Sequence, residues 1–227
     1  MNYASRPAVT TSSTVSDQLW VTYRWMSLGL AITGLTAMGV AHSEAAIELI
    51  LGNRIVFYVL LFAQLGMVMA FAPVARRAST AATAAMFAAY AGLTGLTMSV
   101  IFLVYTAQSI ASTFFITAGA FAGLSAFGAI TKRDLGVVGR FLIFALFGLV
   151  IAMIVNMFVM SSAASLGISI VGVVIFAGLT AYDTQKLKEL YASGEAHANL
   201  PLVGALTLYL DFINMFLFLL RLFGRRR

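Results

Sequence analysis

The segment FAGLTAYDTQKLKELYASGEAHANLPLVGALTLYLDFINMFLFLLR, residues 176–221, consists of two apolar runs separated by a short polar turn, and each run carries one aspartate. Asp183 lies near the end of the first run, and Asp211 lies inside the second. A charged side chain inside a bilayer costs roughly 2.5–3.5 kcal/mol even on lenient insertion scales, so such residues generally have a function. The two aspartates are therefore the first candidates for a functional site.

The composition indicates a membrane protein. The chain has 227 residues, of which 61% are hydrophobic and 10% are charged, whereas about a quarter of the residues in a soluble domain are charged. The sequence has no Cys and two His, which excludes thiolate sites and a His-rich metal centre. Basic residues stand between the apolar runs, as they do at membrane borders. We therefore expect the lipid bilayer as a partner and no nucleic acid, and in the absence of a cofactor motif we predict no enzyme and no cofactor.

Uncharged runs predict an all-α membrane protein with seven transmembrane helices, since one span needs about 20 mostly apolar residues. The polar residues 1–19 are predicted to form a flexible tail, and residues 20–227 the transmembrane domain. Residues 42–48 are expected to form a short acidic loop. Small residues at helical spacing, such as Gly95, Gly119 and Gly123, favour close helix packing. The predicted spans lie at residues 24–42, 54–76, 78–131 (two spans), 141–182 (two spans) and 200–220.

The orientation follows from the Lys and Arg residues in the loops. These residues are more frequent on the side of the N-terminus, which predicts a cytoplasmic N-terminus. The basic tail Arg225–Arg227 goes against this rule, because seven spans place it on the other side. The side of the C-terminus therefore stays open at this point.

The two aspartates are predicted to lie at nearly the same depth. If the sixth helix ends near Tyr191 and the seventh begins near Leu200, Asp183 and Asp211 lie about 12 and about 16 Å from the same face, at ~1.5 Å per residue. Two carboxylates in contact can hold one shared proton near neutral pH and titrate as a unit. Loss of that proton adds repulsion, so the pair would act as a two-state latch. A purely structural role for both aspartates is the alternative.

Further candidates surround the pair. Thr207 and Asn214 share a helical stripe with Asp211, which we expect to face the protein interior. Arg76 and Arg77 end the second span on the same predicted face, so either can reach the aspartates as a basic partner or serve as an ordinary border residue. These oxygens are too few for a tight calcium cage of 6–8 ligands. Asp183 and Asp211 would instead suit weak, transient calcium binding along a path.

Two segments resemble the Bax inhibitor 1 family of transmembrane proteins: GLTAYDTQKLKEL at 178–190 and LYLDFINMFLFLLRLFG at 208–224. The resemblance, to a bacterial member, implies a protein of the inner membrane in which two three-helix layers enclose a central seventh helix. It also implies a pH-dependent calcium leak controlled by an aspartyl pair, which falls on Asp183 and Asp211. The controlling basic residue of the second helix falls on Arg77, or on Arg76 if the loop shifts by one.

Two other functions are alternatives. Some bacterial relatives are similar to a regulator that binds and restrains a membrane-anchored ATP-dependent protease, and the polar tail 1–19 would suit such a contact. An intramembrane aspartyl protease also places two aspartates in helices. The Gly-x-Gly-Asp context of such proteases is missing here, because Tyr209 and Leu210 precede Asp211.

Overall fold

The computed structural model describes residues 12–194 and 197–227. Within these ranges the chain is almost entirely helical. The helices are α1 (Ser12–Ala41), α2 (Glu44–Leu51), α3 (Arg54–Ala75), α4 (Thr80–Met98), α5 (Val100–Val104), α6 (Ala107–Ile130), α7 (Gly136–Val159), α8 (Ser162–Ala192) and α9 (Leu200–Phe223).

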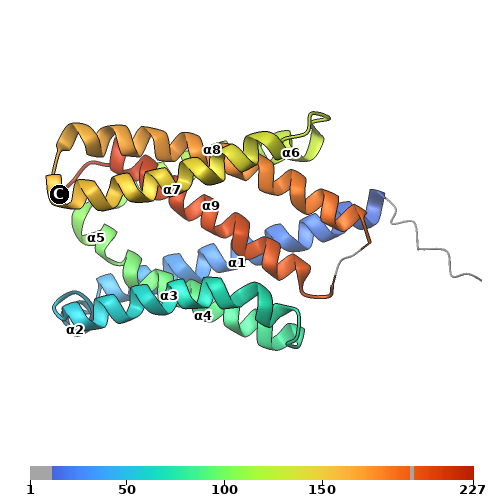
Figure 1. Cartoon of the computed structure of the whole chain (residues 1–227). Helices are drawn as coiled ribbons and strands as arrows, with labels where there is room; N and C mark the ends of the chain where they lie inside the picture. The colour runs from blue at the N-terminus through green and yellow to red at the C-terminus, as the bar shows by residue number, and fades with distance from the viewer. Residues whose placement is uncertain (1–11, 195–196) are drawn as a thin grey trace, which may run out of the picture.

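Helix α9 runs through the centre of the bundle. It lies between a layer made of α6, α7 and α8 and a layer made of α1, α3 and α4 (Figure 1). In α9, 72% of the most apolar 18-residue window is buried, against 6% in α3 and 11% in α7. The lipid-facing helices expose large apolar side chains, as expected where the solvent is hydrocarbon. The predicted arrangement of a central last helix between two layers is therefore found.

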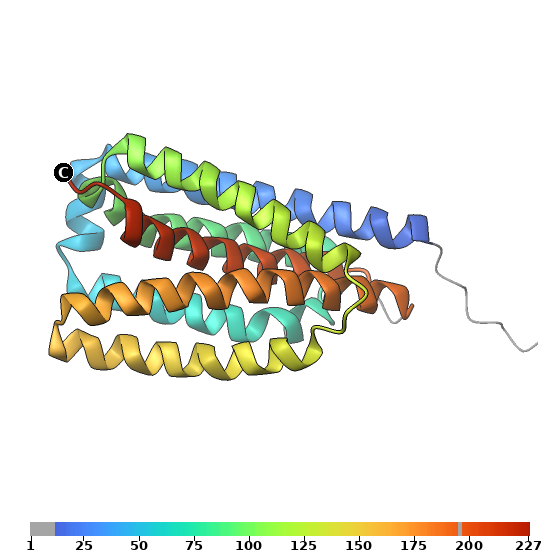
Figure 2. The same ribbon diagram turned by 90° about the horizontal axis from the view of Figure 1, so that it is seen from above.

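The helices are long enough to cross a membrane several times. Six of them have the length and apolar character of a span, and α1 together with the bent α2 adds a seventh, with an angle of 104° between the two. The start of α1 and the C-terminus lie at opposite ends of the bundle (Figure 2). The prediction of a seven-helix, multi-pass membrane protein is confirmed.

Two predicted boundaries are wrong. Helix α1 begins at Ser12, so residues 12–19 are helical rather than part of a flexible tail. Val15 is 8% exposed and packs in the core, which stabilises the additional turns. Residues 1–11, the rest of that predicted tail, lie outside the described residues, and the protease alternative that depends on them stays a prediction.

The expected acidic loop contains the short helix α2. The Ser43 side chain accepts a hydrogen bond from the amide of Ala46 at 3.3 Å, which satisfies one of the free N–H groups at the helix start. Glu44 in the first turn is favourable next to the positive end of the helix dipole. A capping serine followed by a glutamate therefore forms a helix where the charges alone predicted a loop.

Close helix packing occurs at one of the three expected glycines, Gly95, but not at Gly119 or Gly123. A Cβ atom added to Gly95 would lie 2.7 Å from the carbonyl oxygen of Thr33, so α4 and α1 approach closely there. A Cβ added to Gly119 or Gly123 would meet nothing within 4 Å. The close approach of α6 occurs instead at Gly128, where an added Cβ would lie 2.9 Å from the carbonyl carbon of Ala181 on α8.

The chain ends in a short bridge to the junction of α5 and α6. The amide of Thr106 donates to the carbonyl of Arg225, and the amide of Arg227 donates to the carbonyl of Val104, both at 3.0 Å. This pairing surrounds an antiparallel bridge between Tyr105 and Arg226. The C-terminus is thus held at the end of the bundle opposite to the start of α1 (Figure 1).

Candidate functional site

The antiparallel helices α8 and α9 meet in a register set by two glycines. Gly172 lies under the ring of Phe218, where an added Cβ would come within 2.6 Å of it. Nearer the other end, Gly204 lies under Leu187 in the same way, at 2.7 Å. With no side chain at these two positions, the helices pack closely on both sides of the aspartates. The aspartates are consequently held at one level.

The carboxyl groups of Asp183 and Asp211 lie in hydrogen-bonding contact across this interface. Asp211 is 4% exposed, while Asp183 is partly exposed. The Oδ2 atom of Asp211 is buried and has no hydrogen-bond partner among the described residues. Because an ionised carboxylate can only accept hydrogen bonds, two carboxyl groups form a hydrogen bond only when they share a proton. The nearly equal depth predicted from the sequence is therefore accompanied by a contact between the two side chains, which is a hydrogen bond when the pair holds one proton.

Thr207 and Asn214 do not share the buried face with Asp211. Thr207 Oγ1 donates to the carbonyl of Val203 at 3.2 Å, and Asn214 Nδ2 donates to the carbonyl of Leu210 at 2.8 Å. The stripe predicted to face the interior is thus divided, because Asp211 turns toward α8 and the other two turn toward the open side of α9. The open side is a row of partly exposed residues at helical spacing: Val203, Thr207, Leu210, Asn214 and Leu217.

Arg76 and Arg77 are exposed at the end of α3. Among the described residues, neither forms an ion pair or hydrogen bond with Asp183 or Asp211 through its side chain. Lys186, one helical turn after Asp183, is a basic side chain close enough to Asp183 to interact with it electrostatically. Its ammonium group lies 5.8 Å from the centre of the Tyr182 ring. Among the described residues, a lysine of the same helix therefore lies near Asp183, while the role predicted for Arg76 or Arg77 stays a prediction.

Two polar side chains, Gln185 and Asn199, form hydrogen bonds to the α6–α7 and α3–α4 turns. Neither was predicted from the sequence as a functional residue. Gln185 accepts a hydrogen bond from the amide of Leu135 at 2.8 Å and donates to the carbonyl of Arg133 at 2.9 Å. It thereby binds the α6–α7 turn to α8. The only sign of Gln185 in the sequence is its position, as a polar residue two positions after Asp183 in a predicted helix.

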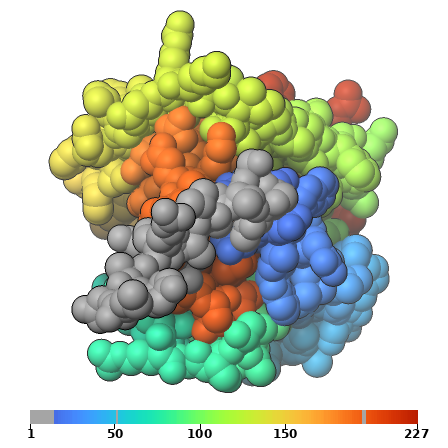
Figure 3. Space-filling view, turned by 90° about the vertical axis from the view of Figure 1, so that its right-hand side faces the viewer, coloured from blue at the N-terminus to red at the C-terminus, as the bar shows by residue number. Residues whose placement is uncertain are grey.

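Asn199 fastens the α3–α4 turn in a similar way. Its Nδ2 donates to the carbonyls of Ala75 and Ala78, at 2.8 and 2.9 Å. The arginines of that turn are thereby held to the start of α9, although their side chains do not reach the aspartates. Figure 3 shows this end of the molecule, with α8 and the start of α9 between the two turns. An asparagine directly before a helix is a recognisable capping signal, but its partners across the bundle are not visible in a sequence.

A resident metal centre is not indicated by the described residues. They contain no group of three or more His, Cys, Asp or Glu side chains that could hold an ion. Asp183 and Asp211 offer carboxyl oxygens, and Asn214, on the open side of α9, adds an amide oxygen that has no partner in the part of the chain that the structure describes. Such a small oxygen set suits a hydrated or passing cation better than a tightly held one.

Comparison with known proteins agrees with this architecture. The family model described as inhibitor of apoptosis-promoting Bax1 matches residues 16–227. The chain is 47% identical over 210 residues to the inner membrane protein YbhL of Escherichia coli K12, covering 90% of each chain. It is 46% identical over 208 residues to a protein of Deinococcus radiodurans, covering 90% of this chain and 89% of the relative. The chain therefore belongs to the Bax inhibitor 1 family of membrane proteins.

Proposed function

We propose that the protein is a pH-sensitive cation leak of the inner membrane, with calcium as the permeant ion and Asp183 and Asp211 as its gate. The observation that supports this most strongly is the contact between two carboxyl groups inside an apolar bundle. A structural hydrogen bond between helices needs only hydroxyl or amide groups. The interaction between two carboxyl groups is attractive while they share a proton and becomes repulsive when the proton leaves. A pH-dependent gate requires such a change.

The energy available to such a gate is sufficient. Two unit charges about 4 Å apart repel by roughly 4 kcal/mol at the effective dielectric found in proteins. A change of that size shifts a two-state equilibrium by about three orders of magnitude. In our proposal the shared proton holds α8 and α9 together, and its loss separates them and opens a route along the oxygens of Asp183 and Asp211. Thr207 and Asn214, on the open side of α9, stay predicted pathway residues. Arg77, or Arg76 in its place, stays the predicted basic partner of the pair.

The test is calcium flux into liposomes that contain the purified protein, measured at several pH values between about 6 and 8, where a coupled carboxyl pair can titrate. We expect the flux to rise as the proton leaves the pair. Asp211→Asn and Asp183→Asn should flatten the pH response, because an amide cannot lose the proton. Asp17→Asn, at an exposed position of α1, is the matched control and should keep the wild-type response.

Two results would refute the proposal. The first is a wild-type flux equal to that of empty liposomes at every pH. The second is a normal pH response in both Asp183→Asn and Asp211→Asn. Arg77→Gln and Arg76→Gln test the predicted basic partner, and Arg54→Gln at the opposite end of α3 is their control. A change of pH response confined to one of the first two variants would identify the residue.

A further inference from the structure

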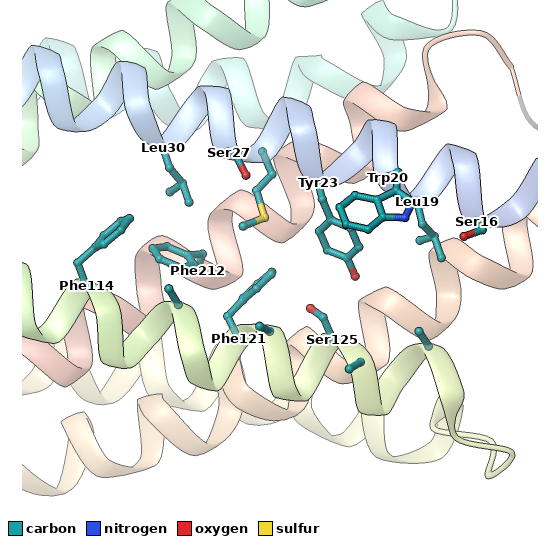
Figure 4. A pocket seen from close by; sticks show the side chains of 15 residues that line it. Ser16, Leu19, Trp20, Tyr23, Ser27, Leu30, Phe114, Phe121, Ser125 and Phe212 are labelled. Carbon is teal, nitrogen blue, oxygen red and sulfur yellow. The ribbon is translucent and has the colours of Figure 1, made fainter.

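A groove of about 520 Å³ lies between α1 and α6. Its floor is formed by Phe121 and by Phe212 of the central helix (Figure 4). Trp20 and Tyr23 of α1 stand at one end, together with Ser125 of α6 (Figure 4). The other end is apolar. The groove therefore changes from polar to apolar along its length, as a lipid does.

We propose that this groove binds one acyl chain of an anionic phospholipid, with the phosphate of the headgroup held by Lys188. The proposal concerns lipid binding and does not depend on the cation leak. Its support comes from the length of the groove, the side chains at its rim and the position of one ammonium group.

The groove is longer than the hydrocarbon thickness of one leaflet. On α1 it extends from Ser16 to Leu30, and on α6 from Phe114 to Ala129. At ~1.5 Å per residue, these segments are about 21 and 22 Å long. Half of a hydrocarbon core of about 30 Å is about 15 Å. The groove is therefore long enough for a chain that enters from the headgroup level and ends near the middle of the bilayer.

The polar end of the groove has the features of a headgroup site. Trp20 is 67% exposed at the rim, and Trp and Tyr prefer the membrane interface. Lys188 Nζ donates to the carbonyl of Ala129, a groove residue, at 2.7 Å. An ammonium group has three N–H donors, so two remain for phosphate oxygens. Lys132 and Arg133 follow α6 directly. Basic pockets between membrane helices are suited to anionic headgroups.

A chain in this groove would touch the helix that carries Asp211. Phe212 is the next residue along α9, and its ring packs against Phe114 and Phe121 of α6, with centroid distances of 5.4 and 5.6 Å. The lipid would thus rest on an aromatic cluster that joins α6 to the centre of the bundle. Binding is expected to stabilise the folded protein, because only the folded state has the groove.

The test is native mass spectrometry of the detergent-solubilised protein with a few molar equivalents of phosphatidylglycerol or phosphatidylethanolamine. We expect the wild type to retain one phosphatidylglycerol and at least fivefold less phosphatidylethanolamine. Ala122→Trp fills the groove and should lower phosphatidylglycerol retention at least fivefold. Ala120→Trp, on the exposed side of the same helix and outside the groove, should retain lipid like the wild type.

Lys188→Gln tests the headgroup assignment independently of the groove that is proposed to hold the acyl chain. This exposed side chain can be changed without disturbing the core, so the variant tests the proposal even if Ala122→Trp does not fold. Its preference for phosphatidylglycerol over phosphatidylethanolamine should fall to about one. Equal retention by Ala122→Trp and Ala120→Trp, both eluting as single folded species, would overturn the groove as the chain site. An unchanged lipid preference in Lys188→Gln would overturn the headgroup assignment.

Discussion

Replacing Gly128 by alanine tests how closely α6 and α8 must approach. An added Cβ would lie 2.9 Å from the carbonyl carbon of Ala181, 3.0 Å from its Cα atom, and nearer still to its oxygen. Carbon and oxygen atoms at helix contacts are normally about 3.3–3.6 Å apart even in a weak hydrogen bond. Because the obstructing atoms belong to the backbone, one helix has to move. Ala181 lies two residues before Asp183, so this movement would also disturb the aspartate contact.

The expected magnitude comes from comparison with Gly123→Ala on the same helix. Both variants gain the intrinsic helix preference of alanine over glycine, about 1 kcal/mol, so this gain cancels in the difference. Only Gly128→Ala adds overpacking, which typically costs about 1–3 kcal/mol, since a Cβ on Gly123 meets nothing within 4 Å. We therefore expect Gly128→Ala to be about 1–3 kcal/mol less stable than Gly123→Ala, roughly a 5- to 150-fold change in the unfolding equilibrium.

The assay is reversible unfolding in mixed micelles with increasing dodecyl sulfate, followed by circular dichroism. Gly123→Ala should unfold at the wild-type midpoint or above it, and Gly128→Ala clearly below it. Equal midpoints for the two alanine variants would refute the reasoning. That result would mean that α6 and α8 separate freely at this contact.

Three further changes test the hydrogen bonds across the bundle. Asn199→Ala should cost about 1–3 kcal/mol, because it removes both bonds to the α3–α4 turn; faster amide hydrogen exchange at residues 76–79 is the measurement, and unchanged exchange contradicts it. Gln185→Leu should release the α6–α7 turn and increase trypsin cleavage after Arg133; a wild-type digestion rate would show that the turn is held otherwise. Thr33→Val should cost about 0.6–1.7 kcal/mol in the same unfolding assay, because it removes a 2.6 Å bond to the hydroxyl of Tyr209.

The depth of the two aspartates could be predicted because it depends on local geometry. Leu200 was expected to begin the last helix and does so, with Asn199 before it and Pro201 in its first turn. Counting residues from a correct helix start then gives the level of Asp211. Nearly equal depth with Asp183 followed, since the short loop brings both helices back to the same face, but the direction in which each side chain turns did not follow from the sequence.

The faces of the helices were harder to predict. Helical spacing placed Thr207 and Asn214 on one stripe with Asp211, but a stripe is wide, and the neighbouring α8 covers only part of it. The position of Arg77 depends on how a turn folds, and Asn199 holds that turn from a distant part of the chain. Such contacts between distant loops have no local pattern, which explains why the sequence could not supply them.

The bridge between residues 104–106 and 225–227 has a practical consequence. A reporter protein fused after Arg227 would follow a segment that is held by backbone hydrogen bonds to the α5–α6 junction. A flexible spacer between Arg227 and the reporter is therefore advisable, so that the reporter does not disturb the hydrogen bonds between residues 225–227 and residues 104–106. Since this corner and the first turn of α1 lie at opposite ends of the molecule, reporters at the two ends would sample different compartments.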